Sequence, residues 1–149
     1  SGWLTYVRVY DNPNLTSLQG LASATYLDLF NLPALQTLGS IYGYRQINIS
    51  GDFGVADFTS GSIAADIQNL MITNAPNITS LNGLGTIKAL NALNLSGNPN
   101  RTSISGLSGL QHVQGLTIWD NAPLPTAAVT TFLGQLNPQV SPQIGHNNG

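Results

Sequence analysis

The chain has 149 residues, of which 7% are charged, and its formal net charge at neutral pH is -2. This length suits one domain with a real core, and the small charge gives no field that would attract nucleic acid or an anionic membrane. The chain holds no cysteine, which excludes a disulfide framework, a zinc–thiolate site and a cysteine nucleophile.

One unit recurs along the chain with a period of about 20–23 residues, which is typical of a solenoid. Its first copy, at residues 7–21, reads V-R-V-Y-D-N-P-N-L-T-S-L-Q-G-L. Each copy predicts one coil, and no coil can bury its apolar residues without its neighbours. We place the copies near residues 7–21, 27–41, 47–63, 70–84, 93–107 and 116–124 of a single domain that covers residues 1–149.

Two spacings of apolar residues divide each copy. Val7 and Val9 alternate with polar residues, which predicts a short strand with one buried face. The following D-N-P-N predicts a tight turn, because Asn and Asp tolerate a left-handed backbone and Pro pre-sets φ. Leu15, Leu18 and Leu21 then lie three apart. That spacing favours either a second short extended segment with a corner or a 3₁₀-like arc, facing the same interior.

The later copies depart from this pattern. The third copy has the irregular turn S-G-D-F-G. The fifth has Arg101 where other copies carry an apolar residue, so we expect a local bulge that turns Arg101 to solvent. Residues 126–136 carry apolar side chains at helical spacing, which predicts an amphipathic helix that caps the open end of the stack. Ile144 then offers one last strand.

The pattern L-x-I-x-x-N-P-x-L-x-S-L-x-G-L resembles the repeat of receptor L domains, which occur in insulin and EGF receptors and in many secreted microbial and fungal wall proteins. The resemblance spans nearly the whole chain and implies a right-handed, single-stranded parallel β-helix. It implies binding or adhesion without catalysis, with no family-wide set of binding residues to carry over. The missing cysteines favour a microbial or algal surface protein over a hormone receptor. An ordinary leucine-rich repeat fits less well, because its hallmark L-x-x-L-x-L-x-x-N is poorly met.

The expected fold, an all-β solenoid of about six coils with a short C-terminal capping helix, fixes which side chains face solvent. If the alternating valines of the first copy point inward, the residues beside them point outward, next to their equivalents in the second copy. Outward aromatic rings often mark interaction sites and also suit the faces of sugars. Trp119, alone at the far end, is interpreted as a partly packed surface aromatic. The candidate ligand-binding residues form three expected neighbour pairs: Tyr6 with Tyr26, Arg8 with Asp28, and Tyr10 with Phe30.

The titratable residues form no catalytic or metal-binding group in the sequence. Glu is absent, and the Asp residues show no grouping of the kind that β-helix polysaccharide enzymes or calcium sites need. Asp11 and Asp120 hold equivalent turn positions and are interpreted as turn-stabilising residues. His112 and His146 have no Ser, Asp or ligand partner at meaningful spacing and are interpreted as surface residues. We expect no catalytic residue, no metal site and no cofactor.

The sequence favours a non-catalytic extracellular or cell-surface recognition or adhesion module, part of a longer chain, that binds a protein or carbohydrate ligand and no nucleic acid. The alternatives are a structural spacer of a larger surface protein and, after it, a carbohydrate-active β-helix enzyme. The alternative explanation of the aromatic patch is that N-terminal sequence, a loop or a partner covers it. No apolar run approaches the roughly 18 residues of a membrane span, so direct membrane insertion is not expected. In a eukaryotic source, sequons would allow N-glycosylation at Asn14, Asn48, Asn77, Asn94 and Asn100.

Overall fold

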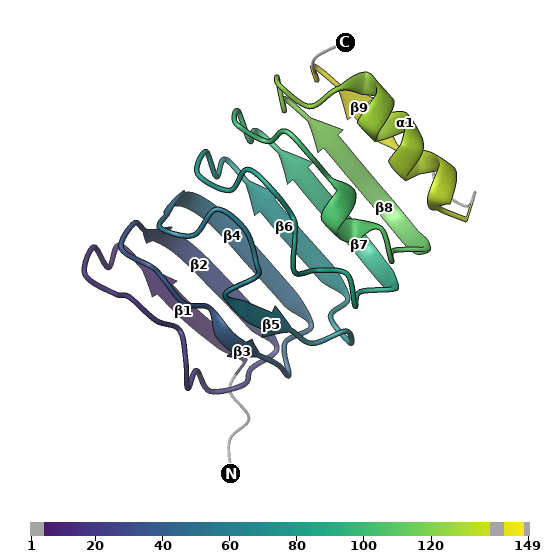
Figure 1. The fold of residues 1–149 in the computed structure, drawn as a ribbon. Helices are drawn as coiled ribbons and strands as arrows, with labels where there is room; N and C mark the ends of the chain where they lie inside the picture. Colours follow the sequence, from purple (N-terminus) through teal and green to yellow (C-terminus); the bar gives the residue numbers. More distant parts are fainter. Residues whose placement is uncertain (1–4, 138–141, 148–149) are drawn as a thin grey trace.

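The computed structural model describes residues 5–137 and 142–147, which form a parallel β-solenoid of about six coils (Figure 1). Successive coils contribute one strand each to a seven-stranded sheet in which every pairing is parallel. The expected all-β solenoid is therefore confirmed, as is the last strand at Ile144. The strands follow each other across the sheet as β1 (Tyr6–Tyr10), β2 (Tyr26–Leu32), β4 (Gln46–Phe53), β6 (Asn69–Thr73), β7 (Ala89–Ser96), β8 (His112–Trp119) and β9 (Gln143–Gly145).

The second wall of the solenoid differs from coil to coil. In the second and third coils it is extended, and β3 (Gly39–Ile41) pairs in parallel with β5 (Gly61–Ile63). In the fifth coil the same wall contains a 3₁₀ turn, η1 (Ser105–Leu107). Both conformations expected from the three-residue spacing therefore occur, in different coils.

Inward side chains of successive coils stack into continuous rows. Leu27, Ile47, Leu70, Leu93 and Leu116 occupy one such row, and each is at most 3% exposed. Full burial of one such side chain contributes about 1.5–3 kcal/mol. The rows of all coils merge into one core that runs along the solenoid.

At or near the end of each strand of the main sheet, one residue has the left-handed conformation. Asp11, Asn31 and Asp120 have φ of 52°, 52° and 53° there, which confirms that Asp11 and Asp120 are turn residues. Glycine takes this position in two coils, as at Gly51 with φ of 80°. A Cβ on Gly51 would come within 2.1 Å of the Asn31 side-chain oxygen, so the amide of one coil needs glycine in the next.

Asparagines in the turns bind each coil to the strand of the preceding coil. Asn98 and Asn121 are both 0% exposed. Asn98 Nδ2 donates to the carbonyl of Ile72 in the preceding coil over 2.8 Å, and Asn121 Nδ2 donates to the carbonyl of Leu95 over 2.6 Å. Asn147 repeats the contact one coil later, donating to the carbonyl of Ile118 over 3.0 Å. The Asn of the G-N-P-N and D-N-A-P turns therefore points inward and satisfies backbone acceptors that burial would otherwise leave unpaired.

Arg101 contradicts the expected bulge. Its backbone N–H donates to the carbonyl three residues earlier over 3.1 Å, as the N–H of Leu35 does over 3.1 Å and that of Ile78 over 3.2 Å. The coil therefore keeps its regular path, and Arg101 lies inside it with 0% of its surface exposed. Its three guanidinium nitrogens have no hydrogen-bond partner among the described residues. Stacking with the coils on either side fixes the path of the backbone, and a charged residue at this position does not change that path.

The predicted helix at residues 126–136 is confirmed as α1 (Thr126–Gln135), which lies at the C-terminal end of the stack (Figure 1). Val129 and Phe132 face the core at 4% and 3% exposure. Gln135 Nε2 donates to the carbonyls of Leu107 and Leu110 over 2.8 and 2.9 Å, which fixes the end of α1 on the fifth coil. Among the described residues, no helix has the length and apolar character of a membrane span.

Candidate functional site

Exposed aromatic rings gather on the outer side of the first two strands. The backbone register confirms the three expected neighbour pairs, because Tyr6, Arg8 and Tyr10 of β1 lie opposite Tyr26, Asp28 and Phe30 of β2. We call these six residues the aromatic face. Tyr10 is 60% exposed and Phe30 is 42% exposed. The rings of Tyr6 and Tyr26 stack with centroids 4.7 Å apart and planes inclined by 18°, so they support each other.

The centre of the aromatic face is an ion pair. Arg8 Nε lies 3.1 Å from Asp28 Oδ2, and the guanidinium carbon of Arg8 lies 5.2 Å from the centroid of the Tyr6 ring. The side chains of Arg8 and Asp28 are 62% and 29% exposed, so solvent screens the pair and its contribution to stability is at most about 1 kcal/mol. Its main effect is to orient both groups and to cancel their charges.

A chain of side-chain hydrogen bonds continues from Asp28 across the next two strands. Asn48 Nδ2 donates to Asp28 Oδ1 over 2.7 Å, and Gln46 Nε2 donates to Asn48 Oδ1 over 3.0 Å. Asn69 Nδ2 extends the chain to Gln46 Oε1 over 3.4 Å. These amides are held in place by one another.

A second cluster of polar and aromatic groups lies at the other end of the sheet. His146 Nδ1 lies 3.0 Å from Asp120 Oδ1, and the rings of Trp119 and His146 are 4.5 Å apart at an interplanar angle of 43°. The interpretation of His146 as a histidine without an Asp partner is therefore wrong. β9 pairs in register with β8, and this brings His146 beside a residue 26 positions earlier. His112, the first residue of β8, is exposed as expected.

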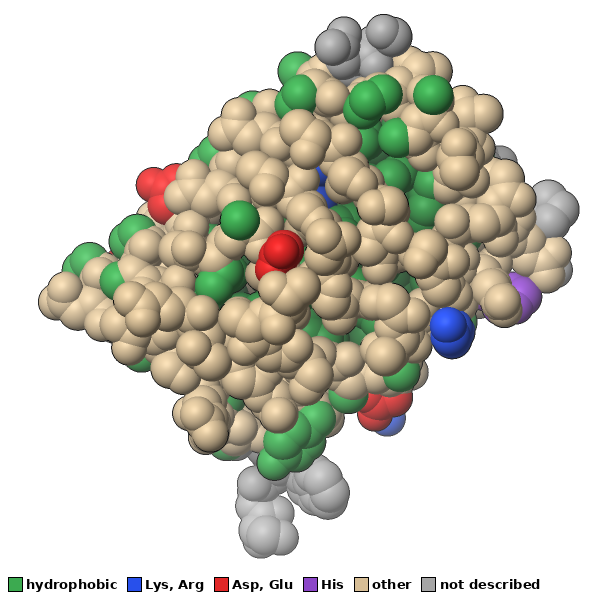
Figure 2. Space-filling model, in the orientation of Figure 1, with side chains coloured by type: hydrophobic (Ala, Val, Ile, Leu, Met, Phe, Trp, Pro, Cys, Tyr) green, Lys and Arg blue, Asp and Glu red, His purple; other side chains and the backbone are tan. Residues whose placement is uncertain are grey.

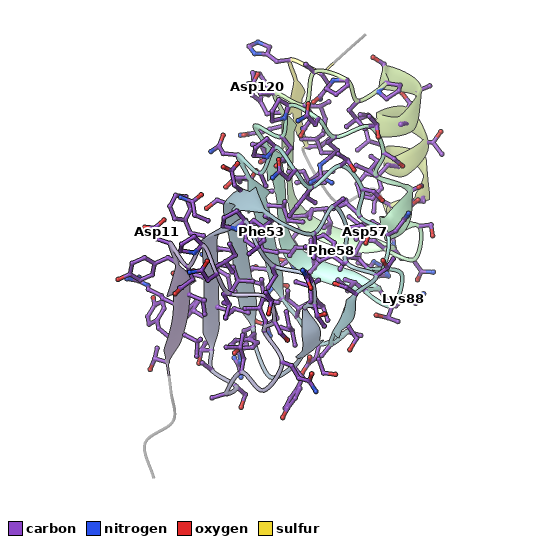
Figure 3. All side chains as sticks on the ribbon, turned by 60° about the vertical axis from the view of Figure 1, so that its left-hand side comes forward. Asp11, Phe53, Asp57, Phe58, Lys88 and Asp120 are labelled. Carbon is purple, nitrogen blue, oxygen red and sulfur yellow. The ribbon has the colours of Figure 1, made fainter. Side chains whose placement is uncertain are left out.

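The carboxylates are dispersed. Asp11 and Asp120 lie at opposite ends of the solenoid (Figure 3). Asp11 and Asp52 line a shallow corner pocket of about 270 Å³ with Asn31, whose Nδ2 donates to Asp11 Oδ1 over 3.0 Å. Among the described residues, no group of three or more His, Cys, Asp or Glu side chains lies close enough to hold a metal ion.

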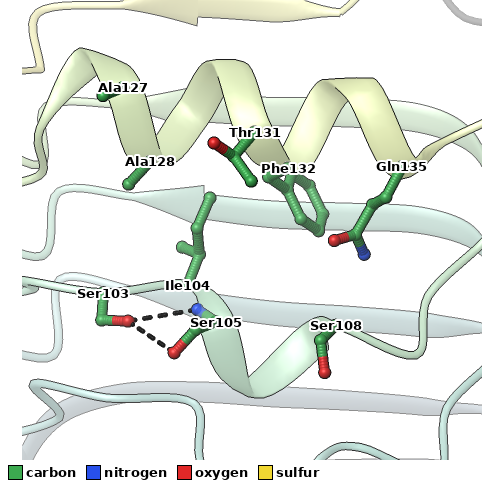
Figure 4. Close-up of a pocket in the computed structure, with 9 residues that line it drawn as sticks. All are labelled: Ser103, Ile104, Ser105, Ser108, Ala127, Ala128, Thr131, Phe132 and Gln135. Atoms are coloured by element: carbon green, nitrogen blue, oxygen red, sulfur yellow. Dashed lines mark hydrogen bonds between the residues drawn. The ribbon is translucent and has the colours of Figure 1, made fainter.

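The wall opposite the sheet carries few, scattered charged side chains (Figure 2). It contains a groove of about 340 Å³ between η1 and α1, with Ile104 and Phe132 among its apolar lining residues (Figure 4). The Ser103 and Ser105 hydroxyls at its rim lie 2.8 Å apart. None of the described residues that line the groove has a titratable side chain, so no neighbouring base among them would make either hydroxyl a nucleophile.

The five sequons have different surroundings. Asn77 Nδ2 and Asn100 Nδ2 donate to backbone carbonyls of the preceding coil over 3.0 and 2.8 Å. Asn48 belongs to the amide chain beside Asp28, and Asn94 accepts a hydrogen bond from the Ser96 hydroxyl. Asn14 is exposed in the turn after β1.

Comparison of the chain with protein-family models, curated proteins and solved structures finds no significant match.

Proposed function

We propose that the solenoid is a non-catalytic recognition or adhesion module that works outside the cell or at its surface. It binds a glycan or protein ligand through the aromatic face of β1 and β2. The observation that carries this proposal is the exposure of Tyr10 and Phe30 on adjacent strands, next to the ion pair of Arg8 and Asp28.

The rings of the aromatic face are exposed and are held on a regular sheet. Rings on a regular sheet lose little conformational entropy when a ligand covers them, and large aromatic side chains dominate the energy of most interfaces. The stacked rings of Tyr6 and Tyr26 lie at one end of the aromatic face, and Tyr10 and Phe30 lie at the other end. The ion pair between these two ends supplies a fixed donor, Arg8, and a fixed acceptor, Asp28.

The arrangement of the described polar groups favours binding over catalysis. Two contacts between basic and acidic side chains occur among the described residues, the ion pair of Arg8 and Asp28 and the contact of His146 with Asp120. Neither pair adjoins a Ser or Thr nucleophile by any hydrogen bond of the described side chains.

Replacement of Tyr10 and Phe30 together by alanine is expected to weaken ligand binding by about 30-fold or more, because each change removes a large apolar contact. Tyr42→Ala is the matched control, since Tyr42 is an equally exposed tyrosine (62%) that lies outside the main sheet. A glycan array and a panel of surface proteins would first identify a ligand for the intact chain, and titration calorimetry would then compare the variants.

Three results would contradict the proposal. Unchanged affinity in the double variant would remove the aromatic face as the binding surface. Absence of any ligand in both screens would favour a structural spacer. Release of sugar from a polysaccharide by the purified protein would overturn the non-catalytic assignment.

A further inference from the structure

One row of outward side chains joins the aromatic face to the far end of the sheet. Tyr10 lies beside Phe30, Phe30 beside Ser50, and Ser50 beside Thr73. At the other end Ser96 lies beside Trp119. The turn residue Asn74 donates its N–H to the Ser96 carbonyl over 3.0 Å, which continues the row from β6 to β7. The residues of this outer row are Tyr10, Phe30, Ser50, Thr73, Ser96 and Trp119.

The outer row has aromatic rings at both ends and hydroxyl groups between them. Phe30 and Trp119 are separated by four strand spacings, which corresponds to about 19 Å at 4.8 Å per strand. Ser50, Thr73 and Ser96 lie in this interval and are half-buried. Their side chains are shorter than the rings at each end of the row.

The position of the Trp119 ring depends on its neighbour Gly145 on β9. A Cβ on Gly145 would come within 2.3 Å of the six-membered ring of Trp119, so the indole leans over Gly145 into space that any other side chain would occupy. His146 contacts the indole at 4.5 Å. One side of the ring therefore rests on β9, and 36% of the residue remains exposed.

The outward side of the sheet carries few charged side chains, which indicates the class of ligand that it would bind. Among the outward residues aligned with Tyr6, Arg8 and Tyr10 on the described strands, only Arg8 and Asp28 are charged, and they form an ion pair. These aligned residues therefore carry no net charge and offer a polyanion no net attraction. The middle of the face carries hydroxyls and amides with Met71 as its one large apolar residue, which lacks the apolar centre of a protein interface.

We propose that the ligand is an extended neutral oligosaccharide that runs along the outer row, across the strands, from Tyr10 and Phe30 to Trp119. Aromatic rings stack on the apolar C–H faces of sugars at the two ends, and the hydroxyls and amides between them bond sugar hydroxyls. This inference rests on the proposed function and adds the ligand class, its direction on the sheet and a second contact point.

The test uses a series of linear neutral oligosaccharides of increasing length, built from β-linked glucose or N-acetylglucosamine. Affinity for the intact chain is expected to rise with length until the ligand spans the outer row. Trp119→Ala is expected to weaken binding of the long members by about tenfold and to leave the short members unchanged, because only long ligands reach Trp119. Tyr10→Ala with Phe30→Ala is expected to weaken binding of all members.

A fluorescence readout covers the case in which Trp119→Ala impairs folding. The chain has two tryptophans, so Trp3→Phe leaves Trp119 as the sole reporter. Long oligosaccharides are expected to change the intensity and wavelength of its emission, while short ones leave both unchanged.

The outcomes separate this inference from the proposed function. If the aromatic-face variant weakens binding while affinity is independent of length and of Trp119, the extended-ligand inference is overturned and the proposed function stands. If an acidic polysaccharide such as polygalacturonate binds more tightly than every neutral one, the neutral class is wrong. If neither variant changes binding, both proposals fail.

Discussion

Replacement of Arg101 by leucine is expected to raise the free energy of unfolding by about 2–4 kcal/mol. Arg101 is fully buried, and its guanidinium nitrogens have no hydrogen-bond partner among the described residues. The equivalent residues of other coils, such as Leu35 and Ile78, are apolar and belong to the core. The substitution therefore removes an uncompensated buried charge at a position whose backbone already suits leucine.

The pKa of Arg101 also indicates that the buried charge lowers the stability of the folded state. Burial lowers the pKa of the Arg101 guanidinium well below its ordinary value, to about 10. One pKa unit corresponds to about 1.4 kcal/mol, so this difference amounts to roughly 3 kcal/mol against the charged form in the folded state. Because the folded state binds the proton less tightly than the unfolded state, the cost is fully present below pH 10 and diminishes only as pH rises above the lowered pKa. The gain from Arg101→Leu is therefore expected to be constant between mildly acidic and mildly alkaline pH.

Urea unfolding followed by circular dichroism would measure the change. Arg45→Leu is the matched control, since it alters net charge equally at an exposed arginine and is expected to change stability by less than about 0.5 kcal/mol. Arg101→Met keeps more of the side-chain length and separates charge removal from any small cavity that leucine leaves. Loss of stability in both Arg101 variants would show that the guanidinium is paired in solution.

Local patterns in the sequence are sufficient to predict the solenoid architecture. Alternation at Val7 and Val9 defines strand faces, and a fixed repeat length brings equivalent positions side by side. The neighbours of Tyr6, Arg8 and Tyr10 on the second strand follow from these two facts, and the backbone register agrees. The candidate face could thus be placed before any coordinate was known, although its role in binding stays a prediction.

Contacts between turns could not be predicted in the same way. The Asn98 amide reaches a carbonyl 26 residues earlier, and His146 reaches Asp120 across the same separation. Both contacts depend on where the turn of one coil falls against the turn of the next, and coil length varies along the chain. The burial of Arg101 could not be predicted for a related reason. A charged side chain favours an exposed position, but the stacked backbone on both sides holds Arg101 inside the coil.

The glycine of the N-P-x-L-x-S-L-x-G-L motif illustrates how coil packing decides what a sequence signal means. Gly83 and Gly106 hold this position in the fourth and fifth coils, and a Cβ on either would strike backbone atoms of the preceding coil, at 2.5 and 2.0 Å. Gly20 holds it in the first coil, where a Cβ would meet nothing within 4 Å. The motif glycine therefore permits close approach of one coil to the coil before it.

Replacement of Gly106 by alanine is accordingly expected to lower the free energy of unfolding by about 3 kcal/mol, because the new methyl group must displace the backbone at Leu81 rather than a flexible side chain. Gly134→Ala is the matched control. Gly134 lies in α1 with nothing within 4 Å of an added Cβ, so alanine there is expected to stabilise the chain by up to about 1 kcal/mol through its higher helix propensity.

The two alanine variants differ from the parent by the same single methyl group, so opposite signs in a thermal or urea unfolding experiment can come only from where that group lies. A Gly106→Ala variant as stable as the parent would mean that the fourth and fifth coils can separate at Leu81 without loss. In that case the core of the solenoid would not be continuous across this junction, and unfolding could proceed in two steps divided there.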